Sequence, residues 1–176
     1  MGKSYYPHSE YEPISGSSYL RSLIVYYSKT GNARWVAQTL AAEIGADVEE
    51  VVEVKKQPSV FGVLRGISIR WQSHETEIAP IVRSPADYDL TIIGTPVWGG
   101  KPTPAIMAYL KKTDLSEKRV AVFFTQGNKK PQGIEETKAL MPNCDYEGAL
   151  SIVNPLEDKE SSEKQIIEWC TKLTPK

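Results

Sequence analysis

The chain has 176 residues, of which 40% are hydrophobic and 24% are charged, and its net charge is −1. This length suits one domain with a substantial core, and the near-neutral charge favours neither nucleic acid nor an anionic membrane as a partner. No apolar run is long enough to span a membrane, and the polar first 18 residues do not form a secretory signal, so we expect a cytoplasmic protein. The two cysteines and two histidines are isolated in the sequence, which predicts no metal site.

The chain opens with residues 1–18, which are rich in Tyr, Pro, Ser and Gly and predict a partly ordered N-terminal arm. A single domain is expected over residues 19–176. Ser22–Tyr27 contains an unbroken apolar run with β-branched and aromatic residues, which is typical of a strand buried on both faces. Arg34–Ile44 has apolar residues at helical spacing, and Gly45 supplies a stop for that helix.

A polar loop, Ser28–Asn32, joins this strand to this helix. A strand–loop–helix unit directs unpaired backbone N–H groups and the positive end of the helix dipole at one point above the strand end, which favours a phosphate. Hydroxyl and amide side chains in the loop can add hydrogen bonds, and Gly31 allows a close approach of the backbone. From this stretch alone, a phosphate site and an ordinary polar connection both remain open.

The remaining elements alternate between strand and helix. The expected strands are Asp47–Val54, Tyr88–Gly94, Arg119–Thr125 and Ala149–Val153. The expected helices are Val60–Gln72, one opened by Thr103 and Pro104, Ile134–Leu140 and Ser161–Lys172. The last helix is expected to turn four residues inward, Ile166, Ile167, Cys170 and Leu173.

This alternation predicts an α/β fold, a doubly wound five-stranded parallel sheet of order 2-1-3-4-5 with helices on both faces. The ligand crevice of such a sheet lies at the carboxyl ends of strands 1 and 3. The loop Ser28–Asn32 and a second, glycine-bearing loop, Thr95–Pro102, are expected to meet there. Trp98 in the second loop should be exposed, so a stacking platform for a flat ring is favoured over core packing.

Three segments together resemble the flavodoxin family, with the resemblance covering about Leu20–Leu173. The first resembles the family's phosphate loop and is Ser28-Lys29-Thr30-Gly31-Asn32-Ala33. The second resembles the loop that packs on the flavin ring and is Thr95-Pro96-Val97-Trp98-Gly99, with Gly100 after it. The third resembles the segment at the polar edge of the flavin and is Thr125-Gln126-Gly127-Asn128. The resemblance implies a flavodoxin-like fold of the short-chain type that binds FMN through these residues.

The resemblance also implies roles for particular residues, and the chain departs from the family pattern at one position. Trp98 is expected to stack on the flavin, and the peptide after it is expected to turn its carbonyl toward flavin N5 when the flavin takes up one electron and one proton. Gly99 permits that turn at low conformational cost. Ala33 stands where the family usually has Thr, which removes one hydroxyl contact with the phosphate, worth about 1 kcal/mol.

Two absences around the ring bear on reactivity. No tyrosine lies in residues 125–133, where many flavodoxins carry a second stacking ring, so one flavin face is expected to be open. Few acidic residues surround the expected ring site, which predicts reduction potentials less negative than those of very acidic flavodoxins.

The resemblance implies an electron carrier, a monomer or weak dimer, that serves redox partner proteins. The donor would be a reductase or a ferredoxin-like protein, and the sequence does not identify the acceptor. No P-loop motif, dinucleotide fingerprint, nucleophile–base pair or pair of catalytic carboxylates is visible, in keeping with a cofactor that carries the redox chemistry. Two alternatives remain open. One is an FMN-dependent NAD(P)H:quinone-type oxidoreductase of the same fold, and the other is an interaction module that has lost the cofactor.

Overall fold

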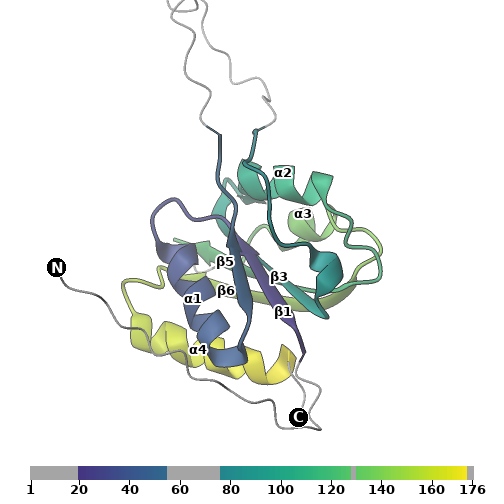
Figure 1. Ribbon diagram of the computed structural model, residues 1–176. Helices are drawn as coiled ribbons and strands as arrows, with labels where there is room; N and C mark the ends of the chain where they lie inside the picture. The colour runs from purple at the N-terminus through teal and green to yellow at the C-terminus, as the bar shows by residue number, and fades with distance from the viewer. Residues whose placement is uncertain (1–19, 55–75, 128–129, 174–176) are drawn as a thin grey trace, which may run out of the picture.

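Five parallel strands lie side by side at the centre of the molecule, in the order β2-β1-β3-β5-β6 (Figure 1). The computed structural model describes residues 20–54, 76–127 and 130–173. The five strands are β1 Ser22–Tyr26, β2 Asp47–Glu50, β3 Leu90–Trp98, β5 Arg119–Gln126 and β6 Asp145–Val153. This order confirms the doubly wound sheet predicted from the sequence. The predicted N-terminal arm and the predicted helix Val60–Gln72 lie outside the described residues.

Helices cover both faces of the sheet, as Figure 1 shows. The four helices are α1 Asn32–Ile44, α2 Pro104–Lys112, α3 Ile134–Lys138 and α4 Lys159–Leu173. Side chains of α1 and α4 pack with Ile24 and Ile92 in one buried cluster. Side chains of α2 pack with Leu23 and Ile93 in a second buried cluster, on the other face. Because successive residues of a strand point to opposite faces, each buried strand contributes to both clusters.

Strand β3 is longer than predicted, because it continues past Gly94 to Trp98. There it pairs with a short antiparallel strand, β4 Lys101–Pro102. The predicted loop Thr95–Pro102 is therefore a β-hairpin, and the prediction was wrong on this point. Gly99 and Gly100 form its two-residue turn with φ values of 58° and 80°. A type I′ hairpin turn requires a positive φ at both positions, which glycine adopts without strain.

Strands β2 and β6, at the two edges of the sheet, also differ from their predictions. Strand β2 ends at Glu50, and beyond it Glu53 forms only an isolated antiparallel bridge with Ile78. Strand β6 begins at Asp145 instead of Ala149, with Gly148 at φ 111° beside an irregularity in its pairing with β5. Edge strands accept polar residues and bulges, so their limits do not follow the apolar pattern.

Helix α4 confirms three of the four residues expected to face inward. Ile166, Cys170 and Leu173 are buried, but Ile167 is 41% exposed, so its prediction was wrong. Trp169, which was not among the predicted residues, is buried. The buried residues follow the spacing i, i+3, i+4, i+7, and Ile167 is one residue off that stripe.

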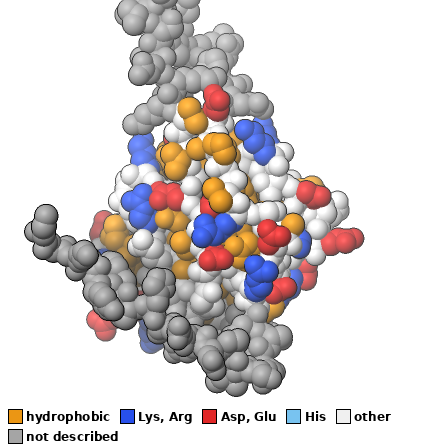
Figure 2. All heavy atoms as spheres, viewed as in Figure 1, with side chains coloured by type: hydrophobic (Ala, Val, Ile, Leu, Met, Phe, Trp, Pro, Cys, Tyr) orange, Lys and Arg blue, Asp and Glu red, His pale blue; other side chains and the backbone are white. Residues whose placement is uncertain are grey.

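Figure 2 views the molecule from the same side and shows hydrophobic side chains gathered in the upper part of this face. The exposed hydrophobic residues near the β2 edge are Val48, Val52, Val54 and Val82. Lys, Arg, Asp and Glu are mixed elsewhere on the face, so no single sign of charge dominates it (Figure 2). None of the helices in the described parts of the chain has the length and apolar character to cross a membrane.

Candidate functional site

The loop between β1 and α1 is shaped by short-range hydrogen bonds. Gly31 caps the helix with φ 93° and ψ −19°, and its carbonyl accepts the first helical bond, from the Trp35 amide at 2.9 Å. The Ser28 hydroxyl accepts a bond from the Arg34 amide at 3.1 Å, and the Asn32 side chain donates to the Thr30 hydroxyl at 3.1 Å. These contacts hold the loop in a compact turn around the amino end of α1.

The amino end of α1 is suited to an anion. The backbone amides of Asn32 and Ala33 have no hydrogen-bond partner within the described residues, as expected for the first turn of a helix. That turn contains no acidic residue, so the positive end of the helix dipole is not neutralised. The Ala33 side chain is 1% exposed and packs in the core, so this position can offer a ligand only its backbone.

The hairpin after β3 carries the second group of predicted site residues to the same end of the sheet. Thr95 is fully buried, and its hydroxyl accepts a bond from the Thr103 amide at 3.0 Å. The two threonine hydroxyls lie 3.2 Å apart. Because these bonds join β3 to the start of α2, they fix the base of the hairpin. Pro96 and Val97 are half-buried, while Trp98 at the tip is 40% exposed.

Two contacts bring the hairpin and the β1–α1 loop together. The Lys29 ammonium lies 5.1 Å from the centre of the Trp98 ring, a cation–π distance. The Tyr27 ring meets the Trp98 ring edge to face, with centroids 6.0 Å apart and an angle of 87° between the planes. Trp98 is thus held from two sides, although much of its surface remains accessible. The sequence did not single out Tyr27, because its apolar neighbours made it look like an ordinary strand residue.

The tyrosines at the end of β1 are tied to nearby carboxylates. The Tyr27 hydroxyl donates to Glu53 at 3.0 Å, and the Tyr26 hydroxyl donates to Glu50 at 3.1 Å. Burial, followed by the bond to Glu53, raises the pKa of Tyr27 to about 12. Tyr27 therefore stays neutral at physiological pH. Arg34 pairs with Glu50 at 2.6 Å and offsets its charge.

The third predicted segment follows β5. Thr125 and Gln126 are buried, and Gly127 is exposed. Asn128 lies outside the described residues. The Gln126 carbonyl accepts a bond from the Asn154 amide at 3.0 Å, which ties this segment to the connection after β6.

The connection after β6 also reaches the first loop, a link that the sequence did not predict. The Leu156 amide donates to the Asn32 side chain at 3.3 Å. The loops after β1, β3, β5 and β6 therefore all lie at the carboxyl end of the sheet, where a doubly wound fold binds its ligand. Across the three described stretches, no group of three or more His, Cys, Asp or Glu side chains could hold a metal ion.

The chain matches the family model for flavodoxin over residues 21–173. None of the curated proteins matches it significantly.

Several solved structures share the fold. One from Bacteroides eggerthii is 22% identical with a TM-score of 0.66, over 85% of this chain and 95% of that one. A flavoprotein in complex with FMN from Lactobacillus acidophilus is 23% identical with a TM-score of 0.61, over 81% and 99%. The two-electron reduced flavodoxin of Megasphaera elsdenii is 20% identical with a TM-score of 0.53, over 86% and 99%. At these identities, the likeness to individual structures shows the fold alone.

Proposed function

The chain belongs to the flavodoxin family, and on that premise we propose that it binds FMN at the carboxyl end of its sheet. The solved flavoprotein from Lactobacillus acidophilus carries FMN on the same fold. The geometry fits this cofactor, because the amides of Asn32 and Ala33 at an uncompensated helix end suit its phosphate. Trp98, partly exposed on its hairpin, offers a flat surface to its ring.

The residues have distinct tasks in this proposal. The loop Ser28–Ala33 holds the phosphate, and Trp98 orients the ring. Gly99 and Gly100 allow the hairpin backbone beside the flavin ring to change conformation. The segment after β5 contacts the polar edge of the flavin. When bound, FMN supplies the one- and two-electron redox chemistry, and the protein sets its position and its electrostatic surroundings.

We propose that this protein carries electrons between redox partner proteins. The observation that best supports this proposal is the contact between Lys29 and Trp98. It joins the loop suited to the FMN phosphate to the residue suited to the flavin ring. A flavin edge beside an exposed Trp98 would be accessible to a partner such as a reductase or a ferredoxin-like donor. We also propose a cytoplasmic monomer or weak dimer.

A second candidate is an FMN-dependent NAD(P)H:quinone-type oxidoreductase of the same fold. The observation that favours it is the lack of any aromatic residue in residues 125–133. A flavin face left uncovered on that side would accept a nicotinamide or a quinone directly. Steady-state oxidation of NAD(P)H by the purified protein, with a quinone as acceptor, would favour the oxidoreductase over the carrier.

The first test is the flavin content of the purified protein. We expect a yellow protein with a flavin absorption band, and an apoprotein that quenches the fluorescence of added FMN with a 1:1 end point. Riboflavin, which lacks the phosphate, should bind more weakly. An apoprotein that does not bind added FMN would instead favour an interaction module that has lost the cofactor.

Replacing Lys29 with Gln should lower the reduction potentials of the bound flavin. The ammonium lies 5.1 Å from the Trp98 ring, so it contributes a positive charge close to a ring stacked on that indole. A positive charge stabilises the reduced, anionic flavin, and its loss should shift the potential by on the order of 50 mV to more negative values. Spectroelectrochemistry measures the shift. Lys164→Gln, on the exposed side of α4, is the matched control and should leave the potentials unchanged.

Replacing Gly99 with Val should also change the potentials, but for a conformational reason. Gly99 has φ 58°, and a β-branched residue there strains the two-residue turn and stiffens the hairpin. If the peptide after Trp98 turns toward flavin N5 on reduction, the two one-electron potentials should move relative to each other. Unchanged potentials in Gly99→Val would argue against a turning peptide while leaving FMN binding intact.

A further inference from the structure

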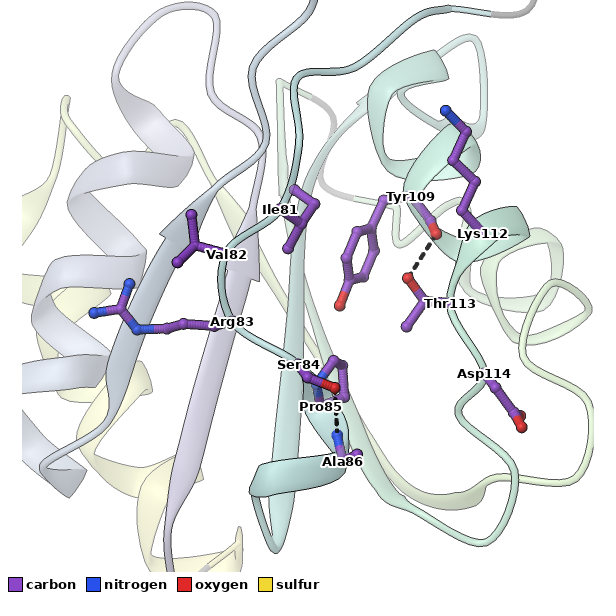
Figure 3. Close-up of a pocket in the computed structure, with 10 residues that line it drawn as sticks. All are labelled: Ile81, Val82, Arg83, Ser84, Pro85, Ala86, Tyr109, Lys112, Thr113 and Asp114. Atoms are coloured by element: carbon purple, nitrogen blue, oxygen red, sulfur yellow. Dashed lines mark hydrogen bonds between the residues drawn. The ribbon is translucent and has the colours of Figure 1, made fainter.

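A pocket of about 380 Å³ lies between the segment that precedes β3 and the carboxyl end of α2 (Figure 3). Ser84, Pro85 and Ala86 line one side, and Tyr109, Thr113 and Asp114 line the other. Residues 84–86 come just before β3, and residues 113–114 lie between α2 and β5. The pocket is therefore at the amino end of the sheet, opposite the proposed FMN site.

Tyr109 brings an unsatisfied polar group to this pocket. Its side chain is 1% exposed, and its hydroxyl has no hydrogen-bond partner within the described residues. Figure 3 shows this hydroxyl pointing from α2 toward the turn at Ser84 and Pro85. Burial raises the pKa of Tyr109 to about 12, so the phenol keeps its proton at neutral pH. The Thr113 side chain, which lies nearby but beyond hydrogen-bond distance, lowers this pKa by a smaller amount, and the negative charge of Glu49 raises it slightly. A buried hydroxyl without a partner is costly and rare in native proteins, which points to a missing partner.

The other polar groups of the pocket are neutral or turned away. The Thr113 hydroxyl donates to the Tyr109 carbonyl at 2.9 Å, and the Ser84 hydroxyl accepts from the Ala86 amide at 3.3 Å. Arg83 points to the opposite side (Figure 3), where it pairs with Glu49 at 3.2 Å. The ends of the Lys112 and Asp114 side chains also point away from Tyr109 in Figure 3. The interior therefore selects for an uncharged ligand.

We propose that this pocket binds a small neutral ring compound that carries a carbonyl or hydroxyl oxygen. The oxygen accepts a hydrogen bond from the Tyr109 hydroxyl, and the ring packs between Ile81 and the buried Pro85. The volume is at the lower end of the range for small-molecule sites, which limits the ligand to about one ring with short substituents. Because the Tyr109 hydroxyl is buried, the proposal requires the ligand to displace the exposed turn at Ser84 and Ala86 before its oxygen reaches that hydroxyl. The proposal does not depend on FMN binding at the other end of the sheet.

The test uses acetophenone as the probe and ethylbenzene as a probe of the same shape without the oxygen. Each is titrated into the full chain as purified, and backbone amide shifts are followed by NMR. We expect saturable shifts confined to residues 81–86 and 109–114. Loss of one hydrogen bond should make ethylbenzene bind about fivefold more weakly than acetophenone.

Tyr109→Phe removes only the hydroxyl and isolates its contribution. Because that hydroxyl has no partner, the variant should fold with an unchanged or higher Tm. Its affinity for acetophenone should fall about fivefold, while its affinity for ethylbenzene stays the same. Tyr146→Phe on β6 is the matched control, because Tyr146 packs against the same buried cluster as Tyr109 but does not line the pocket, and it should bind both probes like the unaltered protein.

Three results would overturn the proposal. The first is the absence of shifts at residues 81–86 and 109–114 at saturating probe. The second is equal binding of acetophenone by Tyr109→Phe and the unaltered protein. The third is a set of shifts only at the loops around Trp98, which would place the probe in the FMN site. The flavin absorption band is read in the same samples, so failure here is distinct from failure of FMN binding.

Discussion

Gly31→Val is expected to weaken FMN binding about 50-fold, equivalent to roughly 2.3 kcal/mol, while riboflavin binding changes little. Gly31 has φ 93°, a conformation that costs a residue with a Cβ about 1–2 kcal/mol, and β-branching adds to this strain. Relief of the strain would rotate the peptide that places the amides of Asn32 and Ala33. Because riboflavin has no phosphate, it does not use these amides. Titration by flavin fluorescence measures both dissociation constants.

Gly45→Val is the matched control for Gly31→Val. Gly45 follows the other end of the same helix, has φ 67°, and has nothing within 4 Å of the position of a Cβ. It carries a similar backbone strain, so both variants should lose stability, but only Gly31→Val should lose the preference for FMN over riboflavin. If Gly31→Val weakens both flavins equally, the β1–α1 loop does not hold the phosphate.

Gly94→Ala is expected to lower the free energy of unfolding by about 3 kcal/mol. A Cβ at Gly94 would lie 2.1 Å from the Cζ atom of Phe123 and 2.8 Å from the Cβ atom of Tyr26. Both neighbours belong to adjacent strands of the same buried sheet, so neither can move without disturbing the core. For a domain of this size, the loss corresponds to a fall in Tm of about 10 °C, measured by circular dichroism.

Two further variants test the cause of the Gly94 effect. Gly127→Ala places a Cβ in ordinary contact, 3.7 Å from the Asn154 side chain, and should change stability little. Combining Gly94→Ala with Phe123→Leu should cost less than the sum of the single changes, because the smaller side chain makes room for the new methyl group. Strict additivity would mean that Phe123 is not the source of the clash.

The sequence was sufficient for the fold because its strongest patterns are long and redundant. The apolar runs in β1 and β5 and the stripe on α1 each require burial, and their alternation allows few topologies. Strand ends were less predictable. Pro96 and the pair Gly99–Gly100 resemble loop residues, yet they lie in a hairpin, since a proline at the end of a strand loses little pairing.

The candidate site was predicted as segments, and the segments lie together at one end of the sheet. The side-chain contacts between them were not predictable. That Lys29 lies over Trp98, and that Tyr27 meets it edge on, depends on rotamers set by neighbours distant in the sequence. The Leu156 amide at Asn32 is another example, because the two residues are 124 positions apart. The roles of the sixteen predicted cofactor-binding residues stay predictions until FMN binding is measured.

The β3–β4 hairpin has a consequence for how this region can vary among related chains. Trp98 lies on a two-stranded antiparallel ribbon and not in an irregular loop, and Lys101 is its direct partner in the pairing. Inserting or deleting one residue between Thr95 and Trp98 would reverse the side of the ribbon on which the indole projects. Length changes here should therefore be tolerated in pairs of residues, whereas single-residue indels should eliminate the platform even when every chemical group is retained.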